Sequence, residues 1–565
     1  MKRPWWHEAI VYQIYPKSFK DTNGDGIGDL KGIIEQLDYI KALGVTVLWL
    51  NPIFKSPQVD NGYDVSDYYA LDPQFGTMED LEYLIDQAKQ RDLKIILDLV
   101  VNHTSDMHPW FREARRSKDS PYRDYYIWRD GTNHHEPTNW ASFFGGSVWS
   151  YDPLTKQYYF HLFDQQMPDL NWENPQVRAE INHIAGFWAL KGIDGFRLDA
   201  IIHLAKDLNF KSIPPLPGRK YQLAESCYAN LPRVHELIHQ FNGALKKKFP
   251  NLLLIGETAS ADAEMAEKYT DPSREECDCA ISFRHLDTEV TDPDPRIPEA
   301  WQEERLNFAA FKKTMHEWQS LNKGWMALYW NNHDMPRLLS RFGDEGKYRM
   351  KNAKMLATLM YLQRGMPFIL QGEEIGMVNL KLPKIKDYAD PGLNEFVRSA
   401  HAAGYSEKQI LRMIQKRSKI TSRGSMQWND SAFAGFSSTS PWLGVNEDYK
   451  TVNTRVEDND PDSLLHYYRK LLQLRGDNSL FCEGSCKLLR PESQSLYIYL
   501  RRYQYRSALV ICNFTGENEV FHYPRLERWN CVLANCRVHP AVHGAITLSA
   551  YECRVYLLEI KEGGH

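Results

Sequence analysis

The sequence predicts a (β/α)8 barrel of the TIM type, with an inserted lobe after the third strand and a C-terminal antiparallel β-domain. Two observations support this prediction. Eight short apolar segments alternate with helical segments over most of the chain, and from about residue 480 apolar segments follow one another without helices between them. The length of 565 residues allows a barrel with additional domains, at roughly 100–200 residues per domain.

The eight strand candidates are short and almost continuously apolar, as expected for parallel strands that are buried on both faces. They are Val11–Tyr15, Val45–Leu50, Ile95–Val101, Gly195–Leu198, Leu252–Ile255, Ala280–Phe283, Met326–Trp330 and Phe368–Leu370. Apolar residues at helical spacing predict helices between them, for example at Ile33–Leu43, Leu81–Lys89 and Val177–Lys191. This alternation is typical of a parallel barrel.

Two stretches depart from the barrel pattern. Residues 104–170 lose the alternation and are rich in Trp, Tyr, Pro, Gly and Asn, which predicts an inserted lobe, domain B. The barrel then comprises residues 1–103 and 171–479, with an irregular subdomain at about 376–455. Residues 480–565 contain apolar segments with turns at short spacing, which predicts a β-sandwich domain.

The composition excludes several classes of protein. Hydrophobic residues make up 43 % and charged residues 25 %, which is typical of a globular protein and excludes disorder and coiled coil. The net charge is −5 and no run of about 18 apolar residues occurs, so we expect neither a nucleic-acid partner nor a membrane span. Nine scattered cysteines lack metal-binding spacing, so we expect free thiols and a cytoplasmic protein. We expect a monomer, and no pattern separates it from a dimer.

Charged residues and histidines collect where the predicted barrel strands end. They are Asp98, His103, Arg197, Asp199, Glu257, His333 and Asp334. A single Asp after a strand is more often a helix cap or a loop acceptor. Barrel enzymes, however, carry their chemistry at the C-terminal ends of the strands, so the whole set on one rim predicts an active site.

Several carboxylates on one rim suit the cleavage of a glycosidic bond. One carboxylate attacks or stabilises the sugar while ionised, and another gives a proton to the leaving oxygen. Arg197 lies two residues before Asp199, so both side chains point to the same side of the strand and the cation keeps Asp199 ionised. Glu257 has no adjacent cation in the sequence, and we expect it to be the proton donor.

Four segments resemble the signature regions of the α-amylase family, glycoside hydrolase family 13. They are Asp98–His103, Gly195–Asp199, Gly256–Glu257 and Asn332–Asp334. Four more are similar to the α-glucosidase and oligo-1,6-glucosidase branch of that family, namely Tyr12–Pro16, Asp60–Asp64, Pro168–Asn174 and Gln371–Met377. The resemblance covers essentially the whole chain. It implies a retaining double displacement with Asp199 as nucleophile, Glu257 as acid/base and Asp334 as transition-state stabiliser.

The same resemblance implies a pocket that is closed beyond the terminal sugar. Asp60 would bind the terminal 4-hydroxyl, Tyr63 would stack on the sugar ring, and Arg423 would pair with Asp60 and close the pocket. The remaining implied sugar-binding residues are His103, Phe144, Phe163, Arg197 and His333. The implied partner is therefore a small oligosaccharide or disaccharide, cut from its end.

Ala200, directly after the nucleophile, bears on the linkage. In this branch Val at that place accompanies α-1,6 cleavage, and a smaller Ala or Thr accompanies α-1,4 cleavage. We therefore predict a retaining exo-α-glucosidase that releases glucose from the non-reducing end of short, maltose-type α-1,4-glucosides. A non-catalytic sugar-binding protein on the same barrel is disfavoured because all three acids are present.

Other activities of this branch stay open as alternatives. They are an oligo-1,6-glucosidase, a trehalose-6-phosphate hydrolase, and a sucrose-isomerising or transglucosylating relative. Val59–Tyr63 and Phe342–Lys347 also look like trehalose-6-phosphate hydrolases. Met167, Met335 and Gly424–Ser425 stand where the branch usually has Gln, Gln and Thr-Pro, which leaves chain length and linkage open.

A loop near the start carries oxygen ligands at alternate positions around a glycine turn. The ligand candidates are Asp21, Asn23, Asp25, Ile27 through its carbonyl, and Asp29. This is the first part of an EF-hand-like loop, but Gly32 stands where the bidentate Glu would be. We predict a structural Ca²⁺, which branch relatives hold in a similar loop, and no organic cofactor. The alternative is a turn held by hydrogen bonds alone.

Overall fold

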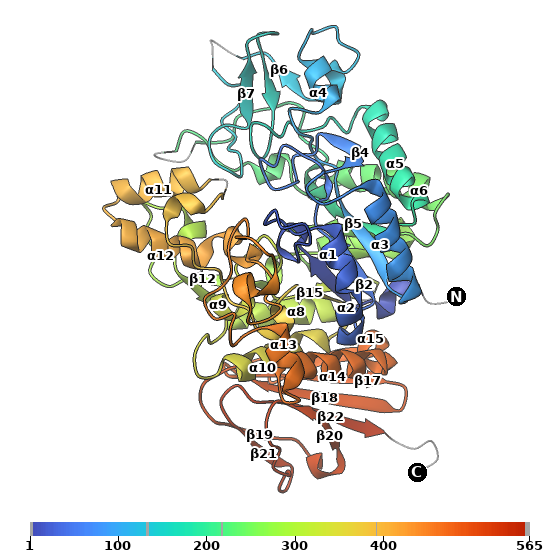
Figure 1. Cartoon of the computed structure of the whole chain (residues 1–565), viewed down its shortest axis with the longest axis vertical. Coiled ribbons are helices and arrows are strands. Elements are labelled where there is room, and N and C mark those ends of the chain that lie inside the picture. The colour runs from blue at the N-terminus through green and yellow to red at the C-terminus, as the bar shows by residue number, and fades with distance from the viewer. Residues whose placement is uncertain are drawn as a thin grey trace.

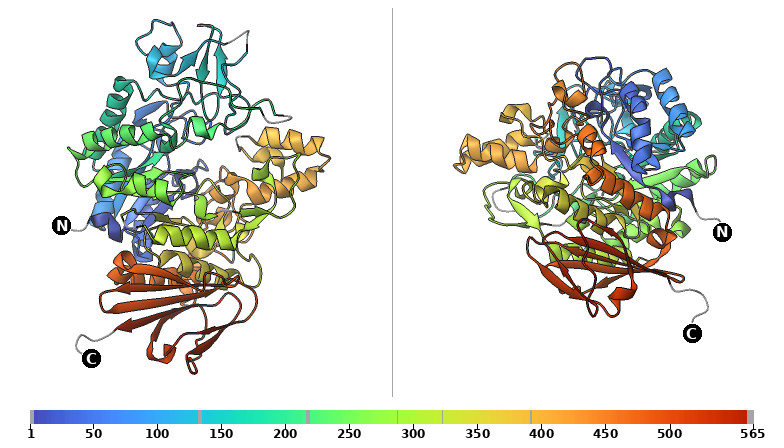
Figure 2. Two further views of the ribbon diagram at one scale, coloured as in Figure 1. Left: turned by 180° about the vertical axis from the view of Figure 1, so that it is seen from behind. Right: turned by 60° about the horizontal axis from the view of Figure 1, so that its bottom comes forward.

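The computed structural model describes residues 4–131, 135–215, 219–286, 288–321, 323–390 and 392–559. The molecule is elongated, with the barrel in its middle, a lobe built from the segment after the third barrel strand at one end, and the C-terminal sheet at the other (Figures 1 and 2). The side of the barrel that faces the lobe is therefore the side away from the C-terminal domain.

Eight parallel strands form the barrel, in the order β11-β10-β9-β5-β2-β1-β15-β14. They are β1 Val11–Ile14, β2 Val47–Leu50, β5 Lys94–Val100, β9 Gly195–Asp199, β10 Leu253–Glu257, β11 Cys279–Ile281, β14 Ala327–Leu328 and β15 Met366–Leu370. A parallel bridge between Ala280 and Met326 joins the two ends of this sheet. The predicted barrel is confirmed, and its seventh strand is shorter than expected.

Helices cover the outside of the barrel. They are α1 Leu30–Glu35, α2 Leu37–Leu43, α3 Met78–Gln90, α5 Pro175–Leu190, α6 Pro232–Lys246, α7 Ala263–Thr270, α8 Phe308–Gln319, α10 Arg349–Tyr361 and α14 Leu464–Gly476. The predicted helix Ile33–Leu43 is broken at Gln36, whose φ of −106° and ψ of 6° lie outside the helical region. No helix in the described part of the chain is long and apolar enough to cross a membrane.

The inserted lobe contains α4 Pro109–Ala114 and a three-stranded antiparallel sheet. Its strands are β6 Trp128–Arg129, β7 Trp149–Asp152 and β8 Gln157–Phe160, in the order β6-β8-β7. The apolar core of the lobe also takes in Phe210, Ala224 and Tyr228, which follow barrel strand β9. The boundaries predicted from the sequence assigned these three residues to the barrel, because nothing in their local pattern shows which core they join.

The segment after β15 is less irregular than predicted. It contains α11 Leu393–Ala402 and α12 Glu407–Arg417, which share a small apolar core of their own. Phe396 and Ala400 of α11 and Ile410 and Ile414 of α12 are fully buried there. Their spacing of four residues is a helical signal that the frequent Pro, Gly and Ser around these helices concealed.

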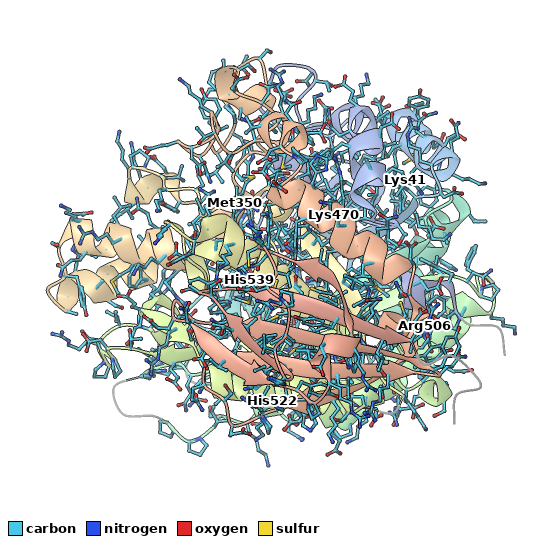
Figure 3. The ribbon with its side chains drawn as sticks, turned by 90° about the horizontal axis from the view of Figure 1, so that it is seen from below. Lys41, Met350, Lys470, Arg506, His522 and His539 are labelled. Atoms are coloured by element: carbon cyan, nitrogen blue, oxygen red, sulfur yellow. The ribbon has the colours of Figure 1, made fainter. Side chains whose placement is uncertain are left out.

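The C-terminal domain is an antiparallel sheet in the order β16-β17-β18-β22-β20, with a two-stranded layer β19-β21 beside it. The bounds are β16 Ser485–Leu489, β17 Leu496–Tyr503, β18 Arg506–Asn513, β19 Glu519–His522, β20 Asn530–Ala534, β21 Ala545–Leu548 and β22 Cys553–Glu559. Alternate residues of β17 join different cores: Tyr497 and Tyr499 join the barrel core, and Ile498 joins the outer one. Figure 3 shows this sheet from below, with Lys470 of α14 beside it.

Candidate active site

The three predicted catalytic acids meet at the C-terminal rim of the barrel. Asp199 is the last residue of β9, Glu257 is the last residue of β10, and Asp334 follows β14. All three line one cavity of about 360 Å³. Other predicted residues that line it are Asp60, Tyr63, His103, Phe144, Phe163 and Ala200.

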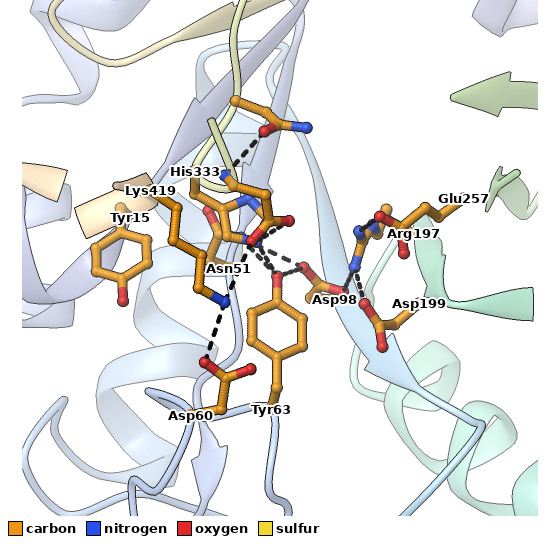
Figure 4. A network of polar contacts seen from close by, with 12 residues as sticks. Tyr15, Asn51, Asp60, Tyr63, Asp98, Arg197, Asp199, Glu257, His333 and Lys419 are labelled. Carbon is orange, nitrogen blue, oxygen red and sulfur yellow. Dashed lines mark hydrogen bonds and ion pairs between the residues drawn. The ribbon is translucent and has the colours of Figure 1, made fainter. Parts of the chain in front are cut away.

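Arg197 lies beneath this cavity and contacts three carboxyl groups. Its Nη1 is 2.8 Å from Oδ1 of Asp98 and 2.6 Å from Oδ1 of Asp199, and its Nη2 is 2.9 Å from Oε1 of Glu257 (Figure 4). Glu257 has no adjacent cation in the sequence, but the fold places Arg197 next to it. The pairing of β9 with β10 puts Arg197 opposite Ile255, two residues before Glu257, and this register could not be read from the sequence.

The nucleophile and the acid/base candidate hold their protons more tightly than usual. Burial raises the pKa of Asp199 to about 7, against the opposing effect of Arg197. Burial likewise raises the pKa of Glu257 to about 7, again against Arg197. One guanidinium cannot balance Asp98, Asp199 and Glu257 together, so the group retains a proton near neutral pH. Double displacement needs one protonated and one ionised carboxyl, and this pair can supply both.

Asp334 lies in a different electrostatic environment. Burial disfavours its charge, but His333, Lys419 and Arg423 outweigh burial and hold the pKa of Asp334 well below its ordinary value. Arg423 Nη2 is 3.3 Å from Oδ1 of Asp334, and Lys419 Nζ is 4.0 Å from the same oxygen. Asp334 is therefore ionised and can stabilise positive charge on a sugar ring.

Tyr63 and His333 form one side of a polar network. The Tyr63 hydroxyl donates to Oδ2 of Asp98 at 2.8 Å and lies 2.5 Å from Nε2 of His333. Gln13 Nε2 is 2.8 Å from Nδ1 of His333, and because an amide nitrogen donates, Nε2 carries the proton of the neutral ring. Both ring nitrogens of His333 thus have protein partners, and His333 is not among the residues that line the cavity. Its predicted contact with a sugar stays a prediction.

The ion-pair partner of Asp60 differs from the prediction. Lys419 Nζ is 3.4 Å from Oδ1 of Asp60, whereas Arg423 contacts Asp334 and donates to the carbonyl of His333 at 2.8 Å. Lys419 and Arg423 are the first and last residues of one short 3-10 helix, Lys419–Arg423. Sequence reasoning missed Lys419 because 359 positions separate it from Asp60 and no local pattern links them.

Several other cavity residues were also missed. They are Phe143, Ile202, His203, Glu225, Ala259, Ser260 and Phe283, together with Met167, which was noted only as a departure from the branch. Most of them follow β9, β10 or β11 by a few residues. Their positions shortly after the strand ends were a signal in the sequence. Position alone, however, does not show which of these side chains point into the cavity.

The predicted metal loop is held by its own hydrogen bonds. The Asp21 carboxylate accepts from the backbone N–H groups of Gly24 and Gly26 at 2.8 Å each, and Asp29 caps α1 by accepting from Gly32 at 2.7 Å. Gly26 has φ +87°, and a Cβ there would lie 2.5 Å from the Ser440 carbonyl oxygen. In the described chain, no three acidic, histidine or cysteine side chains are grouped so that they could hold a metal ion. The oxygen-only donor set still fits Ca²⁺, which stays a prediction.

The rim of acids and the cavity that they line define a glycoside hydrolase on a parallel barrel. A family model described as the alpha amylase catalytic domain matches residues 13–484. The chain belongs to the α-amylase family, glycoside hydrolase family 13.

The similar proteins include an oligo-1,6-glucosidase and trehalose-6-phosphate hydrolases. The oligo-1,6-glucosidase of Parageobacillus thermoglucosidasius is 44 % identical over 99 % of this chain and 100 % of its own length. The trehalose-6-phosphate hydrolase of Bacillus subtilis is 42 % identical over 98 % of each chain. The crystal structure of Bacillus licheniformis trehalose-6-phosphate hydrolase has a TM-score of 0.91 at 42 % identity, covering 99 % of this chain and all of that one.

Proposed function

We propose that the chain is a retaining, exo-acting α-glucosidase that releases glucose from the non-reducing end of short α-1,4-glucosides such as maltose. The observation that carries this proposal is a cluster of charged side chains in the cavity wall. There the pair of Asp60 and Lys419 lies beside Asp334, with Phe144 under the Lys419 ammonium at 5.3 Å from the ring centre. Such a charged cluster can bind the hydroxyls of one terminal glucose, and we infer that it ends the cavity beyond that sugar.

The side chains divide the reaction among them. Asp199 attacks the anomeric carbon while Glu257 gives its proton to the leaving oxygen, and Asp334 stabilises the positive charge that builds up on the ring. In the second step Glu257 takes a proton from water, which attacks the same carbon. Arg197 positions Asp199 and Glu257 by contacting both, and it limits the pKa that burial gives them.

The preference for the α-1,4 linkage rests on Ala200. This residue lines the cavity directly after the nucleophile, and its N–H donates to Oε2 of Glu257 at 2.9 Å. Its side chain ends at Cβ, so the space beside the reacting bond is open to a second ring. A larger side chain there would restrict the angle at which the leaving sugar approaches.

Oligo-1,6-glucosidase activity is the second candidate, because a relative of that name is 44 % identical over nearly the whole chain. Trehalose-6-phosphate hydrolysis is less well supported. Arg341 and Arg417 line a second cavity of about 540 Å³, which adjoins the first at Ser260 and Phe283. Both pair with Glu304, which offsets part of their charge toward a phosphate.

The test is product analysis with maltose, isomaltose, sucrose, trehalose and trehalose-6-phosphate. We expect maltose to be cleaved fastest, with glucose released first as the α-anomer when followed by NMR. Faster cleavage of isomaltose would replace the α-1,4 proposal by the α-1,6 one. Release of the β-anomer would overturn the retaining mechanism itself.

We also propose that the loop Asp21–Asp29 binds a structural Ca²⁺. The loop lies before α1 and packs against Ser437, whose hydroxyl donates to Asp21 at 2.5 Å, so metal loss should loosen this corner of the barrel. We expect EDTA to lower the thermal midpoint and added Ca²⁺ to restore it, with one equivalent found by elemental analysis. An unchanged midpoint in EDTA together with no bound metal would favour the hydrogen-bonded turn.

A further inference from the structure

Asp60 lies in a turn, residues 58–62, whose backbone is strained. Gln58 and Asn61 have φ of +68° and +52°, in the left-handed region that residues with a Cβ rarely adopt, and Gly62 has φ +105°. Such conformations are unfavourable and persist only where the surrounding structure fixes them. The turn therefore needs partners outside itself to keep the Asp60 carboxylate in the cavity wall.

Lys17 is a buried cation that contacts this turn. It lies in the short 3-10 helix Pro16–Ser18, shortly after barrel strand β1, and is 8 % exposed. Its Nζ donates to Oδ1 of Asn61 at 3.1 Å and to Oε1 of Gln58 at 3.3 Å. The ammonium thus holds the side chains of both residues whose left-handed φ is unfavourable.

This ammonium is buried without a direct counter-ion. Its Nζ lies 4.4 Å from the ring centre of Trp442, whose indole N–H donates to the Ser18 hydroxyl at 2.9 Å. Asp72 and Asp64 favour its charge, but neither forms an ion pair with it in the described part of the chain. Burial lowers the pKa of Lys17 to about 8, so the group is still charged at neutral pH. Burying such a charge is unfavourable, and the reaction does not use it.

Other contacts fix a different part of the turn. The Asp64 carboxylate accepts from the backbone N–H groups of Val59 and Asp60, at 2.9 and 3.0 Å. These bonds hold the backbone before Asn61 but do not reach its side chain. Among the described residues, Lys17 is the donor that fixes the Asn61 side chain. Without the ammonium, the later half of the turn would lose its external support.

We propose that Lys17 is a positioning residue for the terminal-glucose site: its ammonium holds the turn of residues 58–62 so that the Asp60 carboxylate faces the cavity. The inference rests on the proposed α-glucosidase function, in which Asp60 binds a hydroxyl of the terminal glucose. Figure 4 shows Asp60 near Lys419, apart from the acids Asp199 and Glu257. Misalignment of the turn should therefore weaken sugar binding more than it slows the chemical step.

Glucose is the probe, because it can occupy the terminal-glucose site without a reaction. We would measure its inhibition constant Ki against hydrolysis of α-glucosyl fluoride, which has no sugar leaving group, together with kcat of that hydrolysis. We expect Lys17→Met to raise Ki about tenfold and to change kcat by less than about threefold. Lys17→Arg keeps a charge and donors, and it should recover part of the loss.

A double-mutant cycle tests whether Lys17 acts through the turn. Asn61→Gly removes the acceptor of the Lys17 ammonium and tolerates the left-handed φ, so it should raise Ki in the same direction. Once this hydrogen bond is lost, removing Lys17 as well should add less than it does alone. The increase in Ki of the double variant should therefore be smaller than the product of the two single increases.

Lys20→Met is the matched control. Lys20 lies three residues after Lys17 and pairs with Glu35 at 2.7 Å, and it does not line the cavity. We expect it to leave Ki unchanged. An unchanged Ki in Lys17→Met, or a double variant that shows the full product, would overturn the role of Lys17. If Lys17→Met does not fold, an unchanged Ki in Asn61→Gly would overturn it. A wild type that neither binds glucose nor cleaves the fluoride would instead refute the proposed function.

Discussion

Glu257 is the residue whose ionisation should limit activity at high pH. Burial raises its pKa to about 7, so it holds its proton below this value and loses it as the pH rises through it. Since only the protonated acid can assist departure of a sugar, kcat/KM for maltose should fall on the alkaline side. Glu257→Gln should reduce kcat/KM for maltose by about 10²–10⁴-fold. Departure of fluoride from α-glucosyl fluoride needs no proton donor. With this substrate, kcat/KM of Glu257→Gln should therefore show no decline at alkaline pH. A decline that persists with the fluoride would assign it to another group.

Lys419 is the residue whose charge balances Asp60 in the cavity wall. Replacing it by Met leaves Asp60 buried without its ion-pair partner, at 6 % exposure. We predict that Lys419→Met lowers kcat/KM for maltose about 100-fold, because a buried carboxylate loses its compensating charge where the terminal glucose binds. Lys416→Met is the control, since Lys416 pairs with Glu303 at the surface. Similar losses in both variants would show that the effect is not local to the cavity.

The active-site residues show which features could be predicted from the sequence and which could not. Asp199, Glu257 and Asp334 were predicted to lie together because each ends or follows a barrel strand, and all parallel strands end at the same rim. The pairing of Asp60 with Lys419 and the contact of Arg197 with Glu257 were not predicted, because they depend on how distant loops fold back and on the pairing of β9 with β10. Contacts of this kind cannot be recognised from the spacing of residues in the sequence.

At the scale of elements, burial decides what can be predicted. The barrel strands are buried along nearly their whole length, and they appear in the sequence as clear apolar segments. The length of β14 was overestimated, because this strand has only two residues. The helices α11 and α12 escaped prediction although each buries a helical stripe. They matter for the site, because α12 ends at Arg417 and the 3-10 helix that carries Lys419 begins two residues later.

This connection predicts a remote effect on activity. Ile414 of α12 is fully buried in the core that α11 and α12 share. We expect Ile414→Ala to destabilise this pair by about 2–4 kcal/mol, because it leaves a cavity there, and to raise KM for maltose as Lys419 becomes less well positioned. Lys408→Ala, an exposed change on the same helix, should do neither. Thermal unfolding and steady-state kinetics of both variants test this prediction. An unchanged KM in Ile414→Ala would show that the packing of α12 does not affect the active site.

At the scale of the whole molecule, the C-terminal sheet belongs to the same packed unit as the barrel. Tyr497, Tyr499 and Val510 of its inner face are part of the barrel core, and the Tyr499 hydroxyl donates to the carbonyls of Thr358 and Leu359 in α10 at 3.2 Å each. The sheet thus packs on helices of the barrel at the end opposite the cavity (Figures 1 and 3). We therefore expect the sheet to stabilise the barrel on the side opposite the cavity.

A shared core should unfold in one step. We predict a single calorimetric transition in which activity and the C-terminal sheet are lost together, because separating the two would expose the apolar face that carries Tyr497 and Tyr499. Tyr499→Ala should lower the midpoint of this transition and keep it single, since it weakens the shared core. Tyr523→Ala, in the outer layer of the β-domain, should shift the midpoint less. Two resolved transitions, with activity surviving the first, would show that the sheet is an independent domain that the barrel does not need.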